Sequence, residues 1–145
     1  MSRVTLFSDG GARGNPGPAG AGVVILSEDG TILAELCKPL GRMTNNQAEY
    51  WGVVFALERL GQLITDGTVI DGATYSLDSQ LIVEQLAGNY RVKNEGLKPL
   101  YDRVLTLLAE LPIDVEFSHV PRRKNVRADQ LANEAMDAVE SNDRE

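Results

Sequence analysis

The chain has 145 residues, 43% of them hydrophobic and 24% charged, which is typical of one compact domain with a real core. A single cysteine and a single histidine exclude an internal disulfide bond and a zinc site built from Cys and His ligands. The net charge of −7 argues against a protein that coats nucleic acid through bulk electrostatics.

The first half of the chain predicts three strands followed by a helix. The segments are a strand over 3–8, a glycine-rich tight loop over 10–22 leading into a strand over 23–26, a turn over 28–30, a returning strand over 31–37 and a helix over about 46–60. The turn joins two antiparallel strands, so the chain opens with a three-stranded meander. The helix places apolar residues on one face, which we expect to be its core face: Val53, Val54, Leu57 and Leu60.

The second half predicts two further strands and three helices. They are a strand over 73–77, a short helix over 79–87, a longer helix over 98–111, a strand over 114–118 and a final helix whose inward residues are Ala128, Leu131, Ala132, Ala135, Met136 and Val139. In the longer helix we expect Leu100, Tyr101, Val104, Leu108 and Leu111 to face inward. The order βββαβααβα predicts an α/β fold with a five-stranded mixed sheet flanked by helices. We expect one domain over 1–140 and a short acidic tail over 141–145.

No stretch of the chain approaches the ~20 apolar residues of a membrane span. Met1, Ser2 and Arg3 lead directly into a strand, which leaves no room for a signal peptide. We therefore expect a cytoplasmic protein that does not associate with membranes.

Four carboxylates stand in distinctive contexts along this chain. Asp9 and Asp78 end predicted strands, Glu49 lies one turn into a helix, and Asp129 lies in the first turn of the last helix. Acidic side chains at strand ends and helix starts can meet at one edge of a sheet, where divalent cations would neutralise them. The pattern indicates a metal-dependent site, and phosphoryl transfer is the chemistry that such a site serves best. Taken one by one, Asp129 can instead favour the helix dipole, Glu49 can be a surface residue and Asp78 can cap the short helix.

A cationic segment follows the fifth predicted strand. Between His119 and Arg127 the chain carries four cations and no acid, so this segment can hold a polyanion beside an acidic metal site, or it can be an ordinary solvated loop. The glycine-rich segment contains neither G-x-x-x-x-G-K-[ST] nor G-x-G-x-x-G, which excludes the common nucleotide-cofactor motifs.

Four separate motifs, in this order, resemble type 1 ribonuclease H. They are Ser8-Asp9-Gly10-Gly11 with Gly14-Asn15-Pro16-Gly17, Thr44-Asn45-Asn46-Gln47-Ala48-Glu49, Asp78-Ser79-Gln80, and the run from His119 through Asn125 to Asp129. The resemblance covers nearly the whole chain and is to the compact bacterial and archaeal branch of the family. Residues 87–94 form a short link where some members insert a basic helical protrusion, and an N-terminal hybrid-binding module is not found, so we do not expect tight, processive binding.

The resemblance implies a ribonuclease H-like fold and an endoribonuclease that cuts the RNA strand of RNA–DNA hybrids. It implies that Asp9, Glu49, Asp78 and Asp129 hold two Mg²⁺ or Mn²⁺ ions, which suits the hard oxygen ligands that these cations prefer. It also implies that His119 acts in proton transfer or product release, a role suited to its ordinary pKa near ~6.5, although a lone histidine is more often a surface residue.

The resemblance further implies which residues bind the hybrid. The residues expected to contact it are Gly10, Gly11, Asn15, Arg42, Thr44, Asn45, Gln80 and Asn94. Asn15, Asn45 and Gln80 would sense the 2′-hydroxyl with main-chain amides of the glycine-rich segment, whereas Arg42, Thr44 and Asn94 would hold a phosphate of the DNA strand. Turn formation by Asn15 and helix capping by Asn45 and Thr44 are structural uses of the same residues.

Two other functions are weighed against the hybrid nuclease. One is a binding module that keeps the fold without catalysis. In such a module we would expect at least one of the four acids to be missing. The other is a different nuclease of the same fold, integrase-like or exonuclease-like. All four acids are present, and the motifs at Thr44–Asn46 and His119–Asp129 favour the hybrid nuclease, which we expect to be a monomer.

Overall fold

A computed structural model describes residues 2–143 and contains every predicted element in the predicted order. The elements are β1 (Arg3–Ala12), β2 (Gly17–Ser27), β3 (Ile32–Met43), α1 (Asn45–Thr65), β4 (Gly72–Leu77), α2 (Gln80–Leu86), α3 (Lys98–Glu110), β5 (Val115–His119), the 3₁₀ turn η1 (Arg122–Lys124) and α4 (Val126–Asp143). The predicted tail over 141–145 falls partly on α4, and its last two residues, like Met1, lie outside the described residues.

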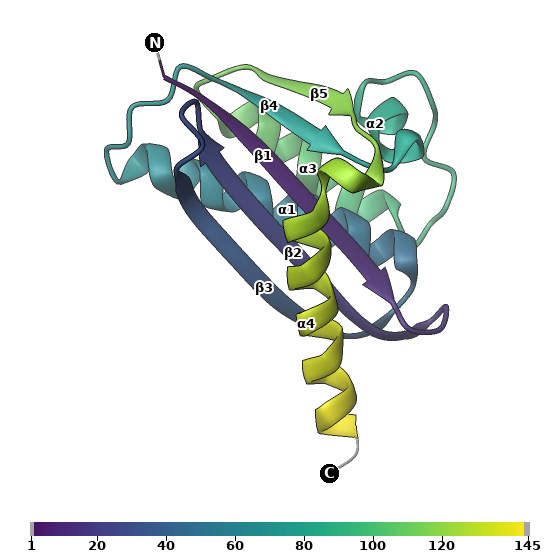
Figure 1. Cartoon of the computed structure of the whole chain (residues 1–145). Coiled ribbons are helices and arrows are strands. Elements are labelled where there is room, and N and C mark those ends of the chain that lie inside the picture. Colours follow the sequence, from purple (N-terminus) through teal and green to yellow (C-terminus); the bar gives the residue numbers. More distant parts are fainter. Residues whose placement is uncertain (1, 144–145) are drawn as a thin grey trace.

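The five strands form one mixed sheet in the order β3-β2-β1-β4-β5. The meander β1-β2-β3 is antiparallel, whereas β4 and β5 are parallel to β1. Helix α4 crosses one face of the sheet over the meander, and α1 and α3 cover the other face (Figure 1). This three-layer arrangement confirms the predicted fold class.

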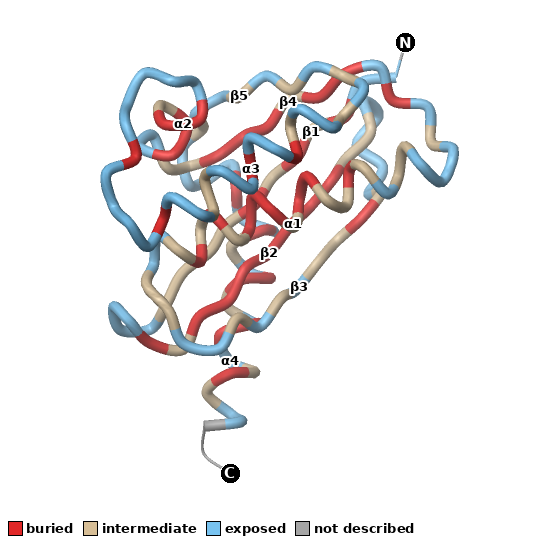
Figure 2. The backbone as a smooth tube through the Cα atoms, turned by 180° about the vertical axis from the view of Figure 1, so that it is seen from behind, coloured by how far each residue is buried: buried red, intermediate tan, exposed pale blue. Residues whose placement is uncertain are grey.

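The main core lies between the sheet and the helices α1 and α3 (Figure 2). The predicted core face of α1 is confirmed, because all four of its residues are at most 1% exposed. In α3 the buried positions are Val104 and Leu107, while the other residues expected inward pack against the core and stay partly exposed. In α4 all six residues expected inward are buried.

The glycine-rich segment is mostly strand, so the prediction of a loop over residues 10–22 was wrong. Residues 10–12 extend β1, residues 17–22 begin β2, and only residues 13–16 lie between the strands. Gly10, Gly20 and Gly22 permit close approach of helices, whereas Gly14, with a φ of +98°, turns the chain between the strands. A Cβ on Gly22 would lie 2.3 Å from the main-chain oxygen of Ala128, so α4 can rest on β2 only where no side chain intervenes.

Two further elements, β3 and α1, are also longer than predicted. Strand β3 continues past Pro39 to Met43. Proline has no N–H to donate to a neighbouring strand, but this is tolerated because β3 is an edge strand. Helix α1 has 21 residues and begins at a capping box formed by Thr44 and Gln47. Within residues 2–143, no helix combines the length and the apolar character that crossing a bilayer would require.

The tight contact at Gly22 predicts a stability difference between two glycine substitutions. Gly22→Ala should lower the free energy of unfolding by about 1–3 kcal/mol, because its new methyl group overlaps the backbone of α4. Gly61→Ala, in the interior of α1 with only a Leu111 side-chain atom at 3.7 Å, should raise that free energy by about 0.5–1 kcal/mol. Urea unfolding of both variants measures the difference, and equal stability of Gly22→Ala and wild type would contradict this packing.

Candidate functional site

The site forms where β1 runs on beyond the end of β4. Strand β1 pairs with β2 as far as Ala12 but with β4 only as far as Phe7. From Asp9 onward, the edge of β1 that faces away from β2 is therefore not covered by a strand. Side chains from both faces of the sheet can meet at this open edge.

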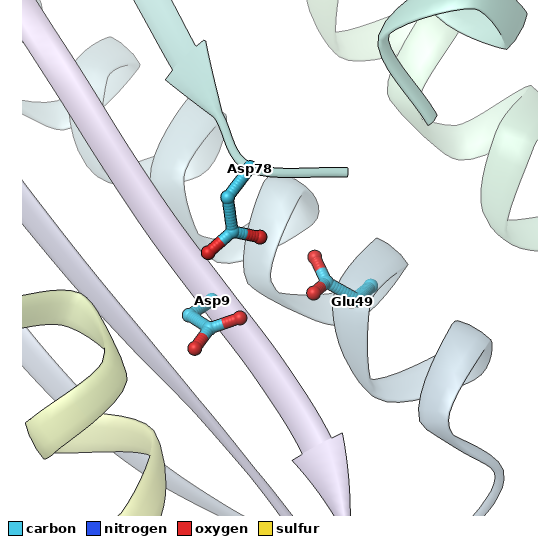
Figure 3. A group of neighbouring side chains, drawn as sticks. All are labelled: Asp9, Glu49 and Asp78. Atoms are coloured by element: carbon cyan, nitrogen blue, oxygen red, sulfur yellow. The ribbon is translucent and has the colours of Figure 1, made fainter. Parts of the chain in front are cut away.

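Asp9, Glu49 and Asp78 meet there. One carboxylate oxygen from each lies within 4.8 Å of the others, although the three residues come from β1, from α1 and from the end of β4. Figure 3 shows the three carboxylates pointing toward one another. The sequence-based prediction that distant acids gather at one sheet edge agrees with this geometry.

Asp129 reaches the same site from α4, on the other face of the sheet. Its carboxyl group is close enough to that of Asp9 to raise the pKa of Asp9. All four acids line one open cavity of about 470 Å³, together with Gly10, Gly11, Asn45, Asn46, Ser79, Arg122, Asn133 and Met136. This cavity is where an ion or a substrate group would sit.

Local structure explains why each acid is available. A Cβ on Gly10 would lie 2.3 Å from the main-chain oxygen of Ala48, so α1 presses directly on β1 and brings Glu49 beside Asp9. Ser79, not Asp78, caps α2, because its hydroxyl accepts from the N–H of Ile82 at 3.3 Å. The capping role considered for Asp78 is therefore filled by its neighbour, and the carboxylate of Asp78 is left for the site.

The acids repel one another and lack cationic partners. In the described part of the chain, none of the four forms an ion pair with a lysine or arginine. Burial, the hydrogen bond with Asp129, and the charges of Asp78 and Asp129 raise the pKa of Asp9 to about 7. Burial and the charge of Asp9 raise the pKa of Glu49 well above its usual range.

The oxygens of this cluster fit divalent ions. Glu49 Oε2 is buried without a hydrogen-bond partner among the described residues, which leaves an acceptor that a cation would satisfy. An all-oxygen set of carboxylates is the ligand type that Mg²⁺ and Mn²⁺ prefer. The residues present therefore fit the binding of a divalent cation.

Asn15, Thr44 and Asn45 form a connected group beside the cavity. The side-chain oxygen of Asn45 accepts from the N–H of Ala12 at 2.7 Å, and the side-chain oxygen of Asn15 accepts from the N–H of Asn45 at 3.0 Å. Thr44 caps α1 by accepting from the N–H of Gln47 at 3.2 Å. The structural roles considered for these residues are thus present, and both asparagines still offer their amide N–H groups.

Besides Asn15 and Thr44, four predicted residues do not line the acidic cavity. His119 ends β5 beside Leu77, the residue before Asp78, and its side chain is exposed. Gln80 is exposed at the start of α2, and Asn94 is exposed with its side-chain oxygen accepting from the N–H of Gly96 at 2.7 Å. Arg42 is exposed near the end of β3.

Several cavity residues were not predicted to act there. Asn133 and Met136 follow Asp129 by four and seven residues, so helical spacing on α4 was a signal that could have placed them. Arg122 lies in the cationic segment, which was predicted to bind only as a group. Ser79 and Asn46 stand inside the motifs quoted above and are brought into the cavity by the starts of α2 and α1.

Comparison with known sequences places the chain among nucleases. A family model described as reverse transcriptase-like matches residues 7–135. A bifunctional protein of Mycobacterium tuberculosis is 42% identical over 139 residues, covering 94% of this chain and 36% of that protein. Ribonuclease HI of Halobacterium salinarum is 44% identical over 135 residues, covering 93% of this chain and 65% of that protein. The chain thus spans from about a third to just under two thirds of the length of these relatives.

Comparison with solved structures gives the same group of proteins. LC11-RNase H1, isolated from compost by a metagenomic approach, superposes with a TM-score of 0.88 at 43% identity, over 95% of this chain and 98% of that one. The same protein in complex with an RNA/DNA hybrid superposes with a TM-score of 0.87 at 44% identity, over 93% of this chain and 97% of that one.

The raised pKa values predict that the metal-free protein loses stability as pH rises. The folded state holds a proton on Asp9 or Glu49 after the unfolded chain has lost it, so unfolding releases protons. This stabilisation is complete below the ordinary carboxyl pKa of 3.8 and is lost as pH rises toward about 7. In EDTA, we expect the free energy of unfolding to fall by roughly 1–3 kcal/mol between about pH 5 and about pH 8.

Urea unfolding at the two pH values measures this loss. The lowered pKa values of Asp29, to about 2, and of Glu35 do not interfere, because those groups titrate below this interval. Asp9→Asn should flatten the dependence, and saturating Mg²⁺ should remove most of it. A metal-free protein that becomes more stable over the same interval would contradict the buried acidic cluster.

Proposed function

This chain belongs to the type 1 ribonuclease H family, and we propose that it is an endoribonuclease that hydrolyses the RNA strand of RNA–DNA hybrids. The observation that carries the proposal is the convergence of Asp9, Glu49 and Asp78 within 4.8 Å, with Asp129 in the same cavity. The complex of LC11-RNase H1 with an RNA/DNA hybrid supports the choice of substrate.

The four carboxylates would hold two Mg²⁺ or Mn²⁺ ions. When bound, such ions activate water and stabilise the charge that develops on the phosphodiester oxygens. The protein holds its acids at one open edge, in a cavity wide enough to admit a sugar–phosphate backbone. Arg122 brings the cationic segment to the wall of this cavity, where it favours the approach of a polyanion.

Asn15 and Asn45 distinguish RNA from DNA. The side-chain oxygen of each asparagine accepts a hydrogen bond from a main-chain N–H, so the groups that can contact a substrate are the amide N–H donors. Donors recognise the 2′-hydroxyl oxygen and the acceptor atoms of the minor groove. Gly11 lies beside them in the cavity wall and lets the backbone of β1 approach the hybrid, and Gln80 extends the contact at the start of α2.

The N-terminus of α1 holds a phosphate of the DNA strand. Thr44 caps a helix of 21 residues, whose dipole favours an anion at this end, although the N–H groups of Asn45 and Gln47 are already hydrogen-bonded. Arg42, two residues earlier, can add a bidentate contact, and Asn94 is the third candidate. In this arrangement the two strands of a hybrid lie on opposite sides of Asn45.

Alternative functions of the fold are disfavoured by the site. A binding-only module would not need a carboxylate such as Glu49 with a buried, unpartnered oxygen, which costs stability. A hybrid with blocked ends distinguishes internal cleavage from cleavage by an exonuclease. Internal cleavage shortens the RNA strand, whereas an exonuclease leaves it intact. Location in the cytoplasm and a monomeric state stay predictions from composition.

A labelled RNA–DNA hybrid tests the proposal. Wild-type protein with Mg²⁺ or Mn²⁺ should cut the RNA strand internally, whereas EDTA or Asp78→Asn should reduce cleavage to background, because both remove the means of holding ions. Asp114→Asn is the matched control, since this exposed aspartate precedes β5 at the opposite end of the sheet and should cleave like wild type. Equal cleavage by Asp78→Asn and wild type, or none by wild type with either metal, would overturn the proposal.

Substitution of His119 should separate turnover from metal binding. His119→Ala should lower kcat on the hybrid by roughly 10²-fold, the contribution typical of one acid–base group. Its Mn²⁺ affinity should match wild type, because the exposed side chain of His119 does not line the acidic cavity. Isothermal titration of Mn²⁺ and steady-state kinetics measure the two quantities; unchanged kcat or lost Mn²⁺ binding would refute the role.

A further inference from the structure

Asn125 is a buried polar residue that the proposed chemistry has not used. It is 1% exposed and lies between η1 and α4. Its side-chain Nδ2 donates one hydrogen bond to the main-chain oxygen of Ser8 at 2.8 Å and another to Oδ2 of Asp78 at 3.2 Å. One amide group therefore joins the backbone of β1 to a carboxylate of the metal site.

The same residue touches the segments that carry three of the four acids. Ser8 directly precedes Asp9, Asp78 is contacted through its side chain, and the N–H of Asp129 donates to the main-chain oxygen of Asn125 at 3.1 Å. Asn125 thus links β1, the end of β4 and the start of α4 at a single point. Only Glu49, on α1, lies outside this link.

The hydrogen bonds define which way the amide faces. Both neighbours of Nδ2 are acceptors, so the reversed amide would bring three oxygens together. An aspartate at this position would place a further negative charge against Asp78. An amide on a short side chain is therefore the group that fits here.

A purely structural role does not account for this geometry. An asparagine that precedes a helix commonly caps it with its side-chain oxygen, but Oδ1 of Asn125 is buried without a partner among the described residues. An unpaired buried acceptor destabilises the folded state. The side chain is turned away from the helix that it could cap and toward Asp78.

We propose that Asn125 is a positioning residue that holds the Asp78 carboxylate in the metal site. Asp78 lies between β4 and α2, where repulsion from Asp9 and Glu49 would otherwise turn its side chain out of the cavity. The hydrogen bond from Asn125 opposes that movement and keeps Asp78 within reach of the other acids. The inference rests on the proposed function, since it assumes that these acids bind divalent ions.

Equilibrium binding of Mn²⁺ to metal-free protein tests the proposal directly. Electron paramagnetic resonance of free Mn²⁺ should show about 10- to 100-fold weaker binding for Asn125→Ala, the loss typical when a group that orients a metal ligand is removed. In hydrolysis of the hybrid, the Mn²⁺ concentration for half-maximal rate should rise by a similar factor, while the rate at saturating Mn²⁺ should return toward that of wild type.

Gln85→Met is the matched control for lost stability. Gln85 is also a buried amide, 6% exposed, and accepts a hydrogen bond from the hydroxyl of Tyr50 at 2.5 Å, but it does not line the acidic cavity. This variant should lose stability and keep the Mn²⁺ affinity of wild type. If Asn125→Ala does not fold, Asn125→Ser replaces it, because serine can cap α4 yet cannot span both acceptors, and its Mn²⁺ binding should also weaken.

The outcomes separate this inference from the proposed function. Mn²⁺ affinity equal to wild type in a folded Asn125 variant overturns the positioning role and leaves the nuclease proposal intact. Equal weakening in the Asn125 variant and in Gln85→Met also overturns it, because general loosening then explains the loss. Wild-type protein that binds no Mn²⁺ overturns the proposed function itself.

Discussion

Two contacts without side chains position the helices that complete the site. Gly10 follows Asp9 and meets the backbone of Ala48, which precedes Glu49; Gly22 pairs with Asp9 in the sheet and meets the backbone of Ala128, which precedes Asp129. In both contacts a Cβ would lie 2.3 Å from a main-chain oxygen. Such a close backbone contact leaves little room for the helix to shift along the sheet. A side chain at either glycine would push the helix away. The spacing of the acids is therefore set by backbone packing on both faces of the sheet.

The core and the acidic cluster have opposite effects on folding. Burial of apolar side chains between the sheet and α1 stabilises the fold, whereas each buried carboxylate costs free energy until a proton or a cation reaches it. A buried hydrogen bond between Ser8 Oγ and the hydroxyl of Tyr75, at 2.6 Å, joins β1 to β4 at the residue before Asp9. A destabilising cluster of buried charges in an otherwise consistent fold is expected at a site that performs chemistry.

The sequence predicted the helices and strands well, because their hydrophobic periodicity is a local pattern. It predicted the site less completely, because the site is built from residues that are distant in the sequence. The core faces of α1 and α4 follow from spacing alone, and the structure confirms them. The glycines of residues 10–22 were taken for a loop, because a glycine that turns the chain and one that admits a helix look alike until the partner is known. Asn125 was visible in a motif, but its contact with Ser8 spans 117 residues and depends on the sheet order. No local pattern carries that information.

Under the proposed function, the residue that would sense the substrate and one that would bind the metal share a single helical turn. Asn45 and Glu49 are four residues apart in α1 and line the same cavity, so a rise of about 6 Å separates them along the helix. Asn45 is itself held at both ends, by Ala12 through its side chain and by Asn15 through its backbone. A rigid helix would therefore fix how far a nucleotide recognised by Asn45 lies from the carboxylates. Under the proposed function this geometry links discrimination to cleavage, since a strand that is not recognised beside Asn45 would not be placed correctly at Glu49.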